Sequence, residues 1–229
     1  MAPKSFDTKP EASSGRKSYI GVGRLKGNAL IPGGDSGIGR AVAILFAGEG
    51  ADVTIVHHPQ EQHDGDDRGS AIQREGREGS SVAFDLENFK NAKEVVDEYL
   101  QMFSKLDILI NNASMQTMEK DFANIDLDLV ESTLRSNILQ MFGVTKYALP
   151  HLKKGVSVID TTSVTTFKGS PAMVDYTLTP AEQMEGFGGH SQLGRPGQPS
   201  EIAPTYVFLA SAEAELYYGQ ILYPYPLGD

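Results

Sequence analysis

Short apolar runs alternate with longer stretches of helical periodicity from Leu25 onward. The short runs are predicted to be strands, and their nearly continuous apolar character suits strands buried on both faces. They cover residues 28–31, 52–56, 81–84, 106–110 and 156–160. The stretches with apolar residues at helical spacing are residues 39–49, 92–103, 127–149 and 200–209. This alternation is typical of βαβ units, so it predicts an α/β fold with a doubly wound, Rossmann-like parallel sheet.

The two ends of the chain depart from this pattern. Residues 1–16 are polar and lack the apolar segment of a signal peptide, so we expect residues 1–22 to form a flexible N-terminal arm. Residues 23–229 show no internal repeat and are expected to form one domain. After residue 161 the rhythm gives way to a Gly- and Pro-rich region at 169–199. An aromatic run at 220–225 is predicted to be a final strand that pairs beside strand 156–160, with helix 200–209 as the crossover.

Composition narrows the classes of partner. The 229 residues carry a formal charge of −10, which disfavours nucleic acid and anionic membranes. The absence of cysteine excludes disulfides and thiolate metal sites, and no apolar run reaches the roughly 20 residues that cross a bilayer. We therefore expect a soluble, cytoplasmic protein that binds a small molecule. A run of histidines and aspartates at 57–67 has no metal-ligand spacing and is interpreted as a solvated loop, so no metal site is predicted.

A glycine-rich turn follows the first of these strands and opens a helix: Gly33-Gly34-Asp35-Ser36-Gly37-Ile38-Gly39. Glycines allow a tight turn and a close approach to a pyrophosphate, and the helix N-terminus offers free N–H groups to it. The segment predicts a dinucleotide site that is formed by Gly33, Ser36, Gly37, Ile38 and Gly39.

The spacing of this turn resembles that of the short-chain dehydrogenase/reductase family, and further segments follow in the family's order. They are Asp85-Leu86, Asn111-Asn112-Ala113-Ser114, Asn137, Ser163 and Tyr176. The resemblance implies that Asp85 and Leu86 lie by the adenine and that Asn112 and Ala113 line the cofactor cleft. It also implies that Tyr176, Ser163 and Asn137 are the catalytic residues.

The cofactor preference rests on His57, which occupies the position of the family's ribose-binding carboxylate. Without a carboxylate to repel a 2′-phosphate, the sequence favours NADP(H) over NAD(H). Pro32 stands where the family has threonine, and it removes a hydroxyl and a backbone donor from the turn.

The chain departs from the family just after Tyr176. The family has lysine four residues later, where this chain has Pro180, and the residues that follow resemble a segment from well downstream. We infer an internal deletion after Thr179 that removes the lysine, about one strand and about one helix. The resemblance implies that this lysine anchors the nicotinamide ribose and lowers the tyrosine pKa. A tyrosine near its ordinary pKa of about 10 is only about one part in a thousand phenolate at pH 7.

These observations predict an NADP(H)-dependent oxidoreductase that reduces a small carbonyl, or oxidises a secondary alcohol, with weakened catalysis and weakened cofactor binding. Three alternatives stay open: a binding module or pseudoenzyme, a non-redox isomerase, dehydratase or cyclase, and a truncated gene model. For Ser163 and Tyr176, the alternative to a catalytic role is that they are inherited loop residues without function. Lys168 is the nearby cation that could replace the lysine. The aromatic tail suggests a homo-oligomer, a dimer or tetramer, through Tyr217, Tyr218, Tyr223 and Tyr225.

Overall fold

A parallel sheet of five strands, in the order β5-β4-β3-β6-β7, forms the centre of the protein. The computed structural model describes residues 11–12, 15–16, 19–61, 69–117, 119, 121–163 and 197–223. The strands of the sheet are β3 (Asn28–Pro32), β4 (Asp52–His57), β5 (Gly79–Ala83), β6 (Leu106–Asn111) and β7 (Leu152–Asp160). The chain adds strands on one side of β3 and then returns to its other side. This order confirms the predicted doubly wound, Rossmann-like fold.

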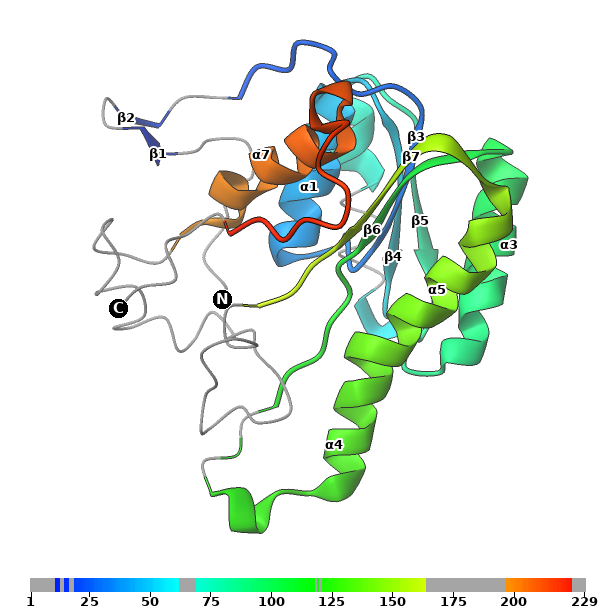
Figure 1. The fold of residues 1–229 in the computed structure, drawn as a ribbon, viewed down its shortest axis with the longest axis vertical. Helices are drawn as coiled ribbons and strands as arrows, with labels where there is room; N and C mark the ends of the chain where they lie inside the picture. The colour runs from blue at the N-terminus through cyan, green and yellow to red at the C-terminus, as the bar shows by residue number, and fades with distance from the viewer. Residues whose placement is uncertain are drawn as a thin grey trace.

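Helices cover both faces of the sheet (Figure 1). Adjacent residues of β3 point to opposite faces, so Ile31 packs with one group of helices and Leu30 with the other. The two helices of the first group lie side by side on the face of the sheet that Ile31 points to, and the two helices of the second group pack together on the face that Leu30 points to. The helices are α1 (Gly37–Gly48) and α7 (Pro199–Ala210) in the first group, and α3 (Ala92–Phe103) and α5 (Gln140–Ala148) in the second.

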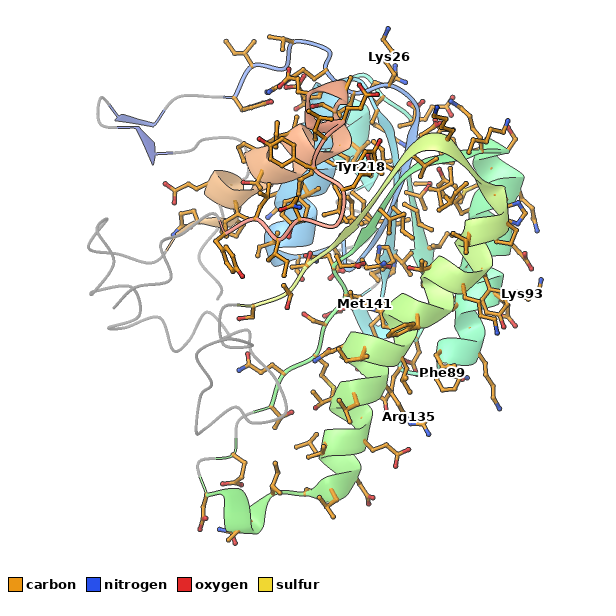
Figure 2. All side chains as sticks on the ribbon, in the orientation of Figure 1. Lys26, Phe89, Lys93, Arg135, Met141 and Tyr218 are labelled. Carbon is orange, nitrogen blue, oxygen red and sulfur yellow. The ribbon has the colours of Figure 1, made fainter. Side chains whose placement is uncertain are left out.

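The predicted helix at 127–149 is not uniform. Its parts are α4 (Leu127–Leu134), the π-helical η4 (Arg135–Leu139), α5 and the 3-10 turn η5 (Leu149–His151). The π turn adds a residue to the helical repeat and buries Asn137 in its middle. The guanidinium of Arg135 lies 5.8 Å from the ring centroid of Phe89, in η2 (Phe89–Asn91), and both are labelled in Figure 2. Three further 3-10 turns are η1 (Pro59–Glu61), η3 (Phe122–Asn124) and η7 (Ala212–Ala214).

A buried carboxylate holds the segment that enters the domain. Glu49, at the end of α1, accepts hydrogen bonds from the backbone N–H groups of Val22 at 3.0 Å and of Arg24 at 2.9 Å. The Arg24 guanidinium and the Tyr19 hydroxyl also donate to this carboxylate. Residues 19–22, which the sequence places in the arm, are thus bonded to the domain. Ahead of them lies a small antiparallel pair, β1 (Glu11–Ala12) and β2 (Gly15–Arg16).

The predicted C-terminal strand is wrong for the described residues. Residues 220–223 form no strand, and β7 is the last strand of the described sheet, while residues 224–225 lie outside the described part. The segment instead follows α7, where the Tyr217 ring meets the Phe208 ring edge-on at 5.0 Å between centroids. A strand is stabilised by hydrogen bonds to neighbouring strands, and no strand of the described sheet pairs with residues 220–223.

No described helix combines the length and apolar character that a bilayer crossing requires.

Candidate functional site

The glycine turn between β3 and α1 is shaped by close backbone contacts. Gly33 has a φ of 74°, and its N–H donates to Val56 O at 2.8 Å. A Cβ at Gly33 would lie 2.6 Å from the Cα of Ala113, at the end of β6. Only glycine fits at this position, because residues with a side chain rarely adopt this φ and because a Cβ would collide with Ala113.

The turn is also closed against Asn112. The Asn112 amide donates from Nδ2 to Gly33 O at 3.0 Å. A Cβ at Gly39 would lie 1.9 Å from that carbonyl oxygen and 2.6 Å from Asn112 Nδ2. The missing side chain at Gly39 therefore makes room for the hydrogen bond. The structure thus brings Gly33, Gly39, Asn112 and Ala113 together at this turn.

The N-terminus of α1 is open on the outer side of this turn. Ser36 precedes the helix in an extended conformation, and both Ser36 and Gly37 are exposed. Arg40 N donates to Ser36 O at 3.0 Å, so the N–H groups of the three preceding helical residues have no partner within the helix. The first helical turn carries no acidic residue. Asp35 is buried, with 4% of its surface exposed. This end of α1 fits a negatively charged phosphate.

The end of β5 is occupied by Asp85 and Leu86. One carboxylate oxygen of Asp85 accepts from Glu87 N at 2.9 Å, and the backbone oxygen of Asp85 accepts from Asn91 Nδ2 at 2.8 Å. Leu86 is buried in the same cluster as Val56. The hydrogen bond from Glu87 N orients the Asp85 side chain, while Leu86 forms part of the core.

The end of β4 presents a buried imidazole. His57 is 2% exposed, and its Nδ1 lies 2.9 Å from His58 O. The backbone oxygen of His57 accepts from Phe84 N at 3.0 Å. Its Nε2 is buried and has no hydrogen-bond partner among the described residues. His58, next to it, is exposed.

Two side chains of the long helix hold the loop after β6. Asn137 donates from Nδ2 to Met115 O at 2.8 Å and accepts from Met115 N at 2.6 Å. Gln140 is fully buried and donates from Nε2 to Ala113 O at 3.1 Å. Asn137 thus uses both ends of its amide on a single backbone unit. Sequence reasoning missed Gln140, although a glutamine at a core-facing position of a helix is a detectable signal.

Ser163 lies three residues after β7, at the same edge of the sheet. The connection is fixed by Thr161 N, which donates to Asn111 O at 2.9 Å. The Asn111 amide donates to Asp160 Oδ1 at 2.7 Å and to Thr145 Oγ1 at 3.0 Å. Sequence reasoning assigned no role to Asn111. Tyr176, Lys168 and the predicted deletion point lie outside the described residues.

Among the described residues, no three or more histidine or acidic side chains gather as metal ligands do. The middle of the histidine and aspartate run, residues 62–68, is outside the described part.

Comparison with known proteins gives the family. Residues 27–179 match the family model described as short chain dehydrogenase. The chain is 36% identical to the uncharacterized oxidoreductase YhdF of Bacillus subtilis (strain 168), over 90% of this chain and 85% of that protein. It is 35% identical to the chloroplastic NADPH-dependent aldehyde reductase 1 of Arabidopsis thaliana, over 96% of this chain and 91% of that protein.

A similar solved structure is that of the NADH-dependent reductase A1-R′ complexed with NAD. It has a TM-score of 0.72 and 25% identity, and the match covers 86% of this chain and 97% of that one. The fold, the closed glycine turn and these matches lead to one conclusion: this chain belongs to the short-chain dehydrogenase family of oxidoreductases.

Proposed function

We propose that the protein is an NADP(H)-dependent oxidoreductase that reduces a small carbonyl compound or oxidises the corresponding secondary alcohol. The observation that carries this proposal is the turn at Gly33, which is closed against Asn112 while the N-terminus of α1 stays open. A Cβ at Gly37 would meet no described atom within 4 Å, so this glycine leaves its backbone open to the close approach that a pyrophosphate-binding turn requires. The residues present therefore fit the phosphate half of a dinucleotide.

The preference for NADP(H) over NAD(H) is supported by the end of β4. A buried His57 and an exposed His58 stand there, and neither of these two described positions carries a carboxylate that would repel a 2′-phosphate. One relative is named for NADPH, whereas a similar solved structure holds NAD. Calorimetric titration with NADPH and with NADH tests the preference, and we expect tighter binding of NADPH. Equal or tighter binding of NADH would contradict it.

A matched variant tests the place of binding. Gly37 has a φ of 53° and lies at the open end of α1. Gly37→Asp puts a negative charge where the phosphates are expected, so it should abolish the binding of either nucleotide. Unchanged binding in this variant would show that the nucleotide binds elsewhere.

The proposed chemistry assigns the proton to Tyr176 and the substrate oxygen to Ser163. When bound, the cofactor supplies the hydride that adds to the carbonyl carbon. The Tyr176 phenol then gives its proton to the carbonyl oxygen, and Ser163 donates a hydrogen bond to the same oxygen. Asn137 holds the loop at Met115 with both ends of its amide, which suits a positioning role. Tyr176→Phe should remove the roughly 10²- to 10⁴-fold contribution of a general acid. Full activity in that variant would refute this assignment.

Weakened catalysis follows from the proposed deletion after Thr179. Pro180 stands where the family has its lysine. The alignment with the Arabidopsis relative runs over 265 residues, more than the 229 residues of this chain, as expected if this chain lacks an internal segment. The missing lysine also favours a second candidate, a non-redox enzyme or a pseudoenzyme that reuses the cleft. Turnover of a metabolite in the absence of any nicotinamide would support that candidate.

We further propose that the protein is a homo-oligomer in the cytoplasm. Tyr217, Tyr218 and Tyr223 of the aromatic tail are exposed, and Tyr218 is labelled in Figure 2. A second exposed apolar stripe follows α4, η4 and α5, at a spacing that keeps its members on one side of the helices. Its members are Leu127, Leu134, Ile138, Phe142 and Leu149. Exposed apolar surface of this kind is typical of a subunit contact, and a second copy of the chain is the partner that we expect.

A further inference from the structure

Three side chains link α7 to the glycine turn through consecutive hydrogen bonds. The hydroxyl oxygen of Tyr206, on α7, lies 2.9 Å from Thr161 Oγ1. Thr161 Oγ1 lies 3.1 Å from Asn112 Oδ1, and Asn112 Nδ2 lies 3.0 Å from Gly33 O. Thr161 directly follows β7, Asn112 directly follows β6 and Gly33 directly follows β3, so the bonds cross the sheet at its carboxyl edge.

The chemistry of the groups gives these bonds a single direction. Gly33 O can only accept, which turns the Asn112 NH₂ group toward it. Asn112 Oδ1 can also only accept, so Thr161 must give its one hydroxyl proton to Asn112. Thr161 then has no proton for Tyr206, and the Tyr206 hydroxyl must be the donor. Every hydrogen bond in the series points toward the turn.

Burial in the core holds the Tyr206 side chain in place. It is 7% exposed, and its helix neighbours Ala203 and Val207 are fully buried against the α1 side of the sheet. Burial raises the pKa of Tyr206, against a smaller lowering by the Thr161 hydrogen bond, so the phenol keeps its proton at neutral pH. A buried donor that lost its partner would carry a cost, which favours the bonded arrangement.

We propose that Tyr206 is a positioning residue of the nucleotide site, which acts through Thr161 to orient the Asn112 amide and hold the glycine turn at Gly33. The role at the nucleotide site rests on the proposed function, because the turn is the proposed phosphate site. The competing explanation is that Tyr206 only fills the core and that its hydroxyl is satisfied by the nearest acceptor.

Hydrogen exchange in the protein without nucleotide tests the positioning role directly. Mass spectrometry would follow the amides of residues 33–40 in Thr161→Val, Tyr206→Phe and the double variant. Loss of one neutral hydrogen bond raises the equilibrium constant for local opening by about three- to tenfold. We therefore expect the amides of this segment to exchange faster by that factor. Thr161→Val should have the larger effect, since it leaves Asn112 Oδ1 without a donor. The double variant should match Thr161→Val alone, because Tyr206 acts only through Thr161.

Tyr99→Phe is the matched control. Tyr99 is also fully buried, but its hydroxyl donates to Lys105 O at 3.1 Å, at the opposite edge of the sheet. The control should lower the overall stability without a specific change at residues 33–40. Unchanged exchange of that segment in both Thr161→Val and Tyr206→Phe would overturn the proposal. Multiplicative effects in the double variant would also overturn it, because they would mean that Tyr206 acts independently of Thr161.

A second measurement connects the turn to the ligand. The calorimetric Kd for NADPH should rise by the same three- to tenfold range in both variants, more in Thr161→Val than in Tyr206→Phe. It should stay unchanged in Tyr99→Phe. Binding to the wild type with no loss in Thr161→Val and Tyr206→Phe would overturn the role at the nucleotide site. A wild-type protein that binds neither NADPH nor NADH would refute the proposed function, and the exchange experiment would still decide whether Tyr206 positions the turn.

Discussion

Glu49→Gln should destabilise the protein by an amount that depends on pH. The Glu49 side chain has no exposed surface and accepts hydrogen bonds from Val22 N, Arg24 N, the Arg24 guanidinium and the Tyr19 hydroxyl. Burial by itself would raise the pKa of Glu49, but these donors together lower it from 4.5 to about 2. Burial and the adjacent carboxylate raise the pKa of Tyr19 to about 12, so Tyr19 stays a donor.

The direction and the size of this change in stability follow from the pKa values of Glu49 in the unfolded and the folded protein. In the unfolded chain the carboxyl group gains its proton near pH 4.5, whereas in the folded protein it stays ionised to about pH 2. The stabilisation is therefore fully present above about pH 4.5 and is lost as the pH falls toward 2. At 1.36 kcal/mol per unit, the shift corresponds to about 3 kcal/mol. Glu49→Gln should lower the free energy of unfolding by about that amount at pH 7, and by much less at pH 3.

Urea denaturation at pH 7, 5 and 3 measures this difference. Glu131→Gln is the control, because Glu131 pairs with Arg135 at 2.7 Å but is 64% exposed. Exposed pairs contribute about 0–1 kcal/mol, so this variant should change little at any of the three pH values. A loss in Glu49→Gln that is the same at all three pH values, or no larger than the control's, would refute the reasoning.

Other predictions concern the site and the surface. Gly39→Ala should lower the melting temperature and weaken nucleotide binding, because its Cβ would lie 1.9 Å from Gly33 O; unchanged calorimetry would contradict this. Asn137→Ala should cost about 1–3 kcal/mol in urea denaturation, because both backbone groups of Met115 lose their partner. Any carbonyl reduction through Tyr176 should stay flat across neutral pH and fall only near about pH 10; a break near pH 7 would point to a cation that replaces the lysine. Phe142→Glu should shift the mass measured by light scattering from oligomer toward monomer, because Phe142 is 72% exposed on the apolar stripe.

The strands and most helices could be predicted because their signals are local. Helix α3 has the predicted bounds, Ala92–Phe103, and its buried Val95, Val96 and Tyr99 show the helical spacing that led to the prediction. Strands β3, β4 and β6 are mainly apolar, with interior polar residues only at Thr54 and Asp107, and most of their residues are buried. The glycine turn was also predictable, since strand, turn and helix follow one another within a short segment.

Features that depend on distant residues were not predictable. The π turn around Asn137 accommodates a backbone unit at Met115, which a helical periodicity cannot anticipate. The final strand was predicted from the aromatic run at 220–225, but a strand needs a neighbouring strand to pair with, and its own residues do not supply one. Gln140 and Asn111 bind groups that are distant in the sequence, so their sequence context indicates burial without indicating what they bind.

The order of strands also has a consequence for how the chain folds. In β3, Ala29 pairs with Val53 on one side and with Ile108 on the other, so the second pairing closes a much longer loop. The entropy cost of loop closure rises with loop length, and non-local pairings slow folding. The unit formed by β3, α1, β4 and β5 therefore has the shorter route to its native contacts. The glycine turn lies inside that unit, but its partner Asn112 arrives only with β6, so we expect the proposed nucleotide site to be completed late in folding.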